Sequence, residues 1–147
     1  MTRRQRGIAA VELALVLPAF VLLLAATVFI GRTLYHYQVM QKAAHDATRY
    51  LASAPALEVS SSSRMAGTVA VAKAIADTEI ADLHTGGDPP VVSVMCNSGG
   101  ACAGFSVPVN VGVRIESLLG DNLVPVNPYG LNGVDLTAQA TMRYVGN

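Results

Sequence analysis

Residues 1–31 read MTRRQRGIAAVELALVLPAFVLLLAATVFIG, and this stretch decides the overall plan of the chain. Three arginines precede Gly7, and a single acidic residue, Glu12, interrupts an apolar run that continues to Ile30. A carboxylate inside a membrane-length apolar segment costs about 2.5–3.5 kcal/mol on insertion scales, so such residues usually have a function. Glu12 is therefore the first candidate functional residue.

The apolar stretch is long enough to cross the roughly 30 Å hydrocarbon core of a bilayer as a helix. It does not end in the small-residue site at which a secretory signal is removed. We therefore expect a membrane-anchoring helix over residues 8–31, in contact with the lipid bilayer. The arginines at the start of the chain favour a cytoplasmic N-terminus, which places residues 32–147 in the periplasm.

The helical pattern continues beyond the membrane segment. No proline occurs from Arg32 to Ala52. Steps of three and four predict a shared helix face, made of Leu34, Tyr37, Gln41, Ala44, Thr48 and Leu51. We expect one helix from about residue 8 to residue 52, kinked or locally unwound at Pro18 and ended by Pro55.

A second helix is predicted after the serines at positions 60–63, which can supply its N-cap. Its apolar residues recur at helical spacing, at Met65, Val69, Ala72, Ala76 and Ile80. The Gly-Gly-Asp-Pro-Pro sequence at residues 86–90 closes this helix, because glycine and proline favour turns.

After Pro90 the hydrophobic period changes to two, which is typical of half-buried strands. Strands are predicted over Val91–Cys96, residues 105–115 and residues 134–144, with Pro108 at an edge or bulge because it lacks a ladder donor. Residues 120–133 are rich in Asn, Pro and Gly and predict a long ordered loop. The fold class is therefore α+β: a long N-terminal helix that spans the membrane in its first half, and a second helix packed on a small antiparallel sheet.

Cys96 and Cys102 enclose the short loop CNSGGAC. Outside the cytosol this spacing is most simply a disulfide, which would contribute about 2–3 kcal/mol. A reduced pair and a metal site are the alternatives, although two thiols without neighbouring histidines are too few ligands for zinc. We expect neither a metal nor a cofactor.

Charge and motif content argue against two classes of function. Lys and Arg together number 10 and Asp and Glu 10, so the chain lacks the basic field of a nucleic-acid-binding protein. His36, His45 and His84 do not lie in a recognisable catalytic motif, and the four consecutive serines fit a linker better than a nucleophile. We expect no enzyme and no catalytic residues.

The order R-R-Q-R-G, then I-A-A-V-E, then a long apolar helix resembles a class III signal cleaved by a prepilin peptidase. The resemblance implies a cut between Gly7 and Ile8, which leaves residues 1–7 as a cytoplasmic leader and makes Glu12 the fifth residue of the mature chain. In pilin-like families that glutamate pairs with the N-terminal amine of a neighbouring subunit. Residues one and five of a helix lie about one turn apart on the same face.

More specifically, R-G-I-A-A-V-E-L-A-L-V-L-P and the later G-R-T-L-Y resemble the N-terminal region of TadE-like pseudopilins, over about residues 3–52. This resemblance implies a pilin-like fold and a minor pilin or pseudopilin that takes part in assembly of a tight-adherence (Flp-type) pilus. Its partners would be a prepilin peptidase, other pilin-like subunits and the pilus assembly machinery.

Two features separate the chain from a major Flp pilin. Leu13 follows Glu12 where major pilins usually have tyrosine, and a domain of about 95 residues follows the helix. The TadE and TadF types both remain open, as does retention in the finished fibre. The alternative from another class is a signal-anchored periplasmic binding or adhesion module, which keeps its leader and never enters a pilus.

Overall fold

The computed structural model describes residues 5–86, 88–97, 99–102, 106–120 and 133–146, with side chains described from residue 10 onward. The chain forms two compact units, Met1–Tyr35 and His36–Asn147. The first unit is the N-terminal part of one long helix. The second is a folded domain that includes the remainder of that helix.

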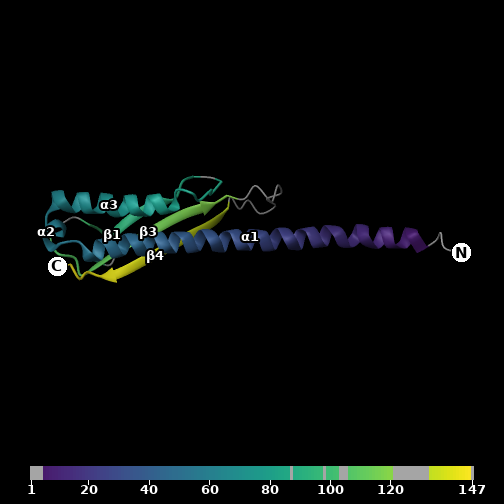
Figure 1. Cartoon of the computed structure of the whole chain (residues 1–147), viewed down its shortest axis with the longest axis horizontal. Coiled ribbons are helices and arrows are strands. Elements are labelled where there is room, and N and C mark those ends of the chain that lie inside the picture. Colours follow the sequence, from purple (N-terminus) through teal and green to yellow (C-terminus); the bar gives the residue numbers. More distant parts are fainter. Residues whose placement is uncertain (1–4, 87, 98, 103–105, 121–132, 147) are drawn as a thin grey trace. The chain divides into compact units, whose positions relative to one another are not determined.

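In the part of the chain that the structure describes, three helices precede four strands (Figure 1). The elements are α1 (Gln5–Ser53), α2 (Ala56–Val59), α3 (Ser62–Ile80), β1 (Val91–Cys96), β2 (Gly100–Ala101), β3 (Asn110–Leu119) and β4 (Val134–Arg143). The strands form one antiparallel sheet in the order β2-β1-β3-β4. The predicted α+β class with a long N-terminal helix is confirmed.

Helix α1 confirms the prediction of one continuous helix from the apolar segment into the domain. It contains Pro18 without an interruption, so the predicted unwound turn is absent. A proline removes one intrahelical hydrogen bond, and proline is tolerated in long apolar helices of the membrane-spanning type. The helix ends at Ser53. Pro55 then occupies the N-cap position of α2, a short helix that the sequence pattern did not predict.

The core of the domain lies between one face of the sheet and two helices. Register places Val92 beside Ile115 and Ile115 beside Ala138, and all three side chains are buried. The Oγ1 of Thr48 on α1 donates a hydrogen bond to the carbonyl of Ala140 on β4 at 3.2 Å. Helix α3 packs against β1. The domain is therefore a two-layer structure in which the opposite face of the sheet carries no helix of the described chain.

The buried face of α1 differs from the predicted one. Leu34 and Tyr37 are 55% and 40% exposed. The residues that are wholly buried in this part of α1 are Met40, Ala43, Ala44, Ala47, Thr48 and Leu51. Ala44, Thr48 and Leu51 belong to the predicted face and are buried, whereas its first two members, Leu34 and Tyr37, are not. Three alanines on the buried face let the helix backbone come close to its neighbours. His36 is also buried, although the sequence pattern had not placed it on the buried face.

Helix α3 follows its prediction closely. It begins after Ser61, which occupies the N-cap position without a side-chain cap hydrogen bond. Met65, Ala72, Ala76 and Ile80 are buried as predicted, but Thr68 replaces Val69 as the fully buried residue of the second turn. The helix ends at Ile80, before the Gly-Gly sequence.

Two strands match, and the third both begins and ends later than predicted, since β3 covers Asn110–Leu119 instead of residues 105–115. β1 covers the predicted residues, and β4 matches to within one residue. β3 begins at Asn110 instead of residue 105, because Pro108 has no N–H to donate and the N–H of Val109 is used by the side-chain oxygen of Asn97, at 2.7 Å. Phe105 and most of the predicted long loop, residues 121–132, lie outside the described residues.

Candidate functional site

The residues of the predicted processing and pairing site lie in one continuous helix. Gly7 and Ile8 fall in the first turns of α1, and Glu12 follows one turn later with an exposed side chain. A separation of four residues corresponds to a rise of about 6 Å along a helix, on one face. Among the described side chains, none forms an ion pair or hydrogen bond with Glu12. Its carboxylate is therefore available to a group from outside the described chain.

The first unit leaves its apolar side chains uncovered. Leu15 is 74% and Leu22 71% exposed, and the apolar part of the helix has 0% of its residues buried inside the structure. Of the helices in the described part of the chain, this one is long and apolar enough to cross a membrane, and it lies near the N-terminus. Apolar surface on this scale needs lipid or other helices around it. The segment is consistent with a single-pass membrane anchor.

Cys96 and Cys102 form a disulfide in the structure, at the end of β1 and just after β2. The loop that it closes turns through Asn97 and Gly99, whose φ angles are 48° and 106°. Asn97 also donates its backbone N–H to the carbonyl of Asn110 at 2.9 Å, so the hairpin is fastened to the start of β3. The sequence pattern located the cysteine loop but not strand β2, which has only two residues and forms by pairing with β1.

The ionisable side chains of the domain whose pKa values are clearly shifted take part in contacts that hold the domain together. Lys42 on α1 donates a hydrogen bond to Glu79 on α3 at 2.8 Å and lies 3.3 Å from Asp46. The hydrogen bond to Glu79 raises the pKa of Lys42, and the Lys42 ammonium lowers the pKa of Asp46. Burial raises the pKa of Tyr144, whose hydroxyl donates to the carbonyl of Ala54 at 2.6 Å. These contacts join α1 to α3 and to the end of β4.

The histidines do not gather into a site. His36 is buried, His45 is exposed, and Nδ1 of His84 lies 2.9 Å from the carbonyl oxygen of Asp82. The described residues contain no group of three or more His, Cys, Asp or Glu side chains placed to hold a metal ion.

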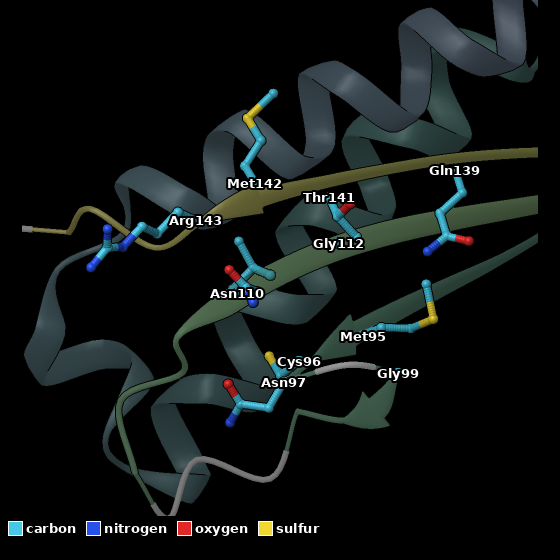
Figure 2. A pocket seen from close by; sticks show the side chains of 11 residues that line it. Met95, Cys96, Asn97, Gly99, Asn110, Gly112, Gln139, Thr141, Met142 and Arg143 are labelled. Carbon is cyan, nitrogen blue, oxygen red and sulfur yellow. The ribbon is translucent and has the colours of Figure 1, made fainter.

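One feature of the domain was not singled out by the sequence pattern. It is a hollow on the helix-free face of the sheet, beside Gly112 of β3 (Figure 2). The available signal was a glycine within the alternating residues of a strand, which often marks a close approach of another group. The alternation by itself gave Gly112 no role.

Comparison with known proteins finds a similarity in the N-terminal part of the chain. Residues 7–49 match the family model described as TadE-like protein. No curated protein and no solved structure matches the chain significantly. The family match covers α1 from Gly7 almost to its end and leaves α3 and the sheet unassigned. It agrees with the resemblance found in the N-terminal sequence.

Proposed function

We propose that this chain is a minor pilin or pseudopilin that takes part in the assembly of a tight-adherence (Flp-type) pilus. In this proposal residues 1–7 are a cytoplasmic leader, residues 8–31 cross the bacterial inner membrane, and residues 32–147 form a periplasmic domain. The observation that carries it is the family match, which starts at Gly7 and runs through Glu12 along a helix with uncovered apolar side chains.

Processing by a prepilin peptidase would occur between Gly7 and Ile8. A protease needs an extended, accessible backbone at the bond that it cuts, whereas the structure has this bond inside the first turns of α1. Glycine is a poor helix former and has no side chain, so it lowers the free energy needed to unwind the turn and lets the backbone approach closely. Both properties support Gly7 as the residue before the cut.

Cleavage would create a new amine on Ile8, one helical turn from Glu12. A lone ammonium or carboxylate in lipid is unfavourable, and pairing the amine of one subunit with Glu12 of the next offsets much of that desolvation cost. Because both groups occupy fixed helical positions, the pair would also set the axial register between neighbouring subunits. Other pilin-like subunits and the pilus machinery are the partners in this proposal, and the role is structural, not enzymatic.

Intact mass and N-terminal sequencing of the membrane-extracted protein test the proposal. The protein is produced with and without an active prepilin peptidase, and a Gly7→Val variant serves as the control that resists cleavage. We expect the mature chain to begin at Ile8 only when peptidase and Gly7 are both present. A chain that still begins at Met1 beside an active peptidase would instead support the signal-anchored binding module.

A further inference from the structure

The folded domain has two ends that can be told apart by contacts inside it. We call the end at which α1 enters the domain, at His36, the entry end, and the opposite one the far end. β4 runs in the same direction as α1, because Ala140 contacts Thr48 and the later Val145 donates its N–H to the carbonyl of Ala52. α3 runs back toward the entry end, since α2 joins its start to the end of α1 (Figure 1).

Charged side chains without an ion pair are separated by sign between these ends. Among the described residues of the domain, the aspartates without an ion pair all lie toward the entry end and are exposed: Asp77, Asp82, Asp88 and Asp135. The arginines without an ion pair all lie toward the far end and are exposed: Arg49, Arg64 and Arg143. Glu58 at the far end and Lys73, midway along α3, do not follow this division. The domain therefore has an acidic entry end and a basic far end.

The acidic end combines carboxylates with apolar surface. Asp88 and Asp135 line one hollow of about 510 Å³, together with Val91, which is 61% exposed. Glu116 and Arg114 also line this hollow, but they form an ion pair with one another. The carboxylates of Asp88 and Asp135 are therefore the charges in this lining that no described group neutralises.

The basic end has a matching composition. Figure 2 shows the side chain of Arg143 directed away from the other labelled residues, along the end of β4. Val145 follows two residues later and is 70% exposed. Val109, which is 65% exposed, accepts a hydrogen bond at its carbonyl from the N–H of Tyr144 at 2.9 Å. An exposed cation thus lies beside exposed valines, as exposed carboxylates do at the entry end.

The two ends of one domain cannot neutralise each other. Asp135 and Arg143 lie eight residues apart on β4, which corresponds to about 27 Å along a strand. The Debye length in physiological salt is only about 8 Å, so the two side chains do not interact within one molecule. Because eight is an even number, both side chains point to the same, helix-free face of the sheet. The opposite charge for each end must therefore come from another molecule.

We propose that the far end of one domain binds the entry end of a second copy of this chain. Arg143 of one copy lies between Asp88 and Asp135 of the next, and Val145 packs against Val91. A second copy is the partner because this chain carries both complementary surfaces. The contact is head-to-tail, so it joins copies in a row instead of closing a two-fold pair.

The head-to-tail arrangement also suits a membrane anchor. It keeps the second halves of α1 in neighbouring copies in the same direction, as anchors in one bilayer require. A two-fold contact between equal ends would bring like charges together, which is unfavourable. This orientation in one bilayer rests on the proposed assembly role, whereas the separation of charge within the domain does not.

Energy transfer between fluorescently labelled copies in phosphatidylcholine vesicles tests the proposal. The full-length, uncleaved chain carries a donor or an acceptor dye on Ser62→Cys, which is exposed at the start of α3. We expect transfer well above the level of random encounters in dilute salt. Transfer should fall to the random level as salt rises from about 20 mM to about 500 mM, because the charges at the two ends are screened.

Charge-reversal variants locate the contact. Arg143→Glu and Asp135→Arg should each weaken self-association about tenfold, since an attraction becomes a repulsion. A mixture of the two variants, with the donor on one and the acceptor on the other, should recover the transfer of the unmodified chain. Lys73→Glu is the matched control, because it reverses an exposed charge that belongs to neither end, and it should keep the transfer. Thermal melts confirm that each variant is folded.

Several results would overturn the proposal: transfer that does not depend on salt, an equal loss in Lys73→Glu and Arg143→Glu, or no recovery in the mixture. Gln139→Cys tests the competing antiparallel pairing of two β4 strands, in which residue 139 lies opposite itself because it is midway between Asp135 and Arg143. Disulfide-linked dimers of this variant under mild oxidation would also overturn the proposal.

None of these measurements depends on cleavage after Gly7. A failure of head-to-tail binding would leave the cleavage result and the proposed assembly role standing. A chain that stays uncleaved beside an active peptidase would contradict the assembly role but leave the contact between domains measurable.

Discussion

The two halves of α1 make a direct comparison, because similar residues in one helix have opposite environments. Leu15 in the first unit is 74% exposed, whereas Leu51 in the domain is 0% exposed. Apart from Glu12, the first half is predominantly apolar around its circumference, and the second half buries one face that contains three alanines together with Met40 and Leu51. The first half is therefore suited to surroundings outside this chain, and the second to the chain's own sheet and helix α3.

The largest expected effect belongs to the first half and concerns function. Glu12→Ala should leave cleavage after Gly7 and the melting temperature of the domain unchanged but reduce pilus output by about tenfold or more, because the neighbour's amine loses its partner in lipid. Pilus output is measured by counting pili, cleavage by N-terminal sequencing, and the melting temperature by a thermal melt. Normal pilus output would mean that Glu12 serves membrane topology alone.

The next effect belongs to the second half. Leu51→Ala should lower the free energy of unfolding by about 2–5 kcal/mol, since it removes a fully buried side chain and leaves a cavity. Leu15→Ala is the matched control and should change it by no more than about 0.5 kcal/mol. Denaturation followed by circular dichroism measures both. Similar effects at the two positions would remove the distinction between the halves.

The next prediction concerns how much the Cys96–Cys102 disulfide contributes to the free energy of unfolding of the domain. Replacing Cys96 and Cys102 together by alanine should cost about 2 kcal/mol, the loop-closure entropy for a loop of this size. Reduction of the unmodified protein should produce a similar loss and should not affect the double variant. Alkylation of the non-reduced protein should add no mass, and an added mass would show that the thiols are free.

Tyr144→Phe should lower stability by about 1 kcal/mol, because its hydroxyl donates a hydrogen bond of 2.6 Å to the carbonyl of Ala54. Tyr37→Phe is the control, since the Tyr37 hydroxyl accepts its bond from Gln41 on an exposed part of α1. A comparison of the two melting temperatures separates the loss of a tertiary bond from the loss of a bond within one helix. Equal shifts would contradict the structural role of Tyr144.

The smallest effect concerns the exposed ion pairs of Lys42. The folded-state pKa of Lys42 is raised above its ordinary 10.5, so its contribution is present below that pH and is lost as the pH rises further. The pKa of Asp46 is lowered from 3.8, so its contribution is present above about pH 4 and is lost in stronger acid.

Glu79→Gln should remove most of the fall in melting temperature at alkaline pH and leave the fall at acidic pH. At neutral pH the melting temperature should change little, because solvent screens the Lys42–Glu79 ion pair. Asp77→Asn removes an equal charge from an exposed position on the same helix and should preserve both dependences. Melting temperatures measured from pH 3 to pH 11 distinguish the variants. If the melting temperature of Glu79→Gln still falls at alkaline pH, another titrating group must cause that fall.

The sequence located strands correctly where the hydrophobic pattern of a segment agrees with its hydrogen-bonded pairing in the sheet. It failed where the pairing alone determines the end of a strand. β4 followed from alternation because its apolar residues Leu136, Ala138 and Ala140 face the core, and β1 followed from its short β-branched run. Val107 and Val109 continue the same alternation but lie outside β3 and are 46% and 65% exposed. Alternation indicates that a segment could be a strand, whereas a ladder partner with free donors determines where it begins.

The sequence by itself determined the membrane-length helix, the place of Gly7 before it and the one-turn spacing from Ile8 to Glu12. These depend on residues close together in the chain, so hydrophobicity and helical period are enough to find them. Only the tertiary structure decided which face of α1 is buried, where β2 forms and that a hollow lies beside Gly112. The buried face of α1 and the hollow depend on residues that are remote in sequence and become adjacent only when the domain assembles, as Thr48 and Ala140 do. Strand β2 lies close to β1 in sequence, but its two residues form a strand only through pairing with β1.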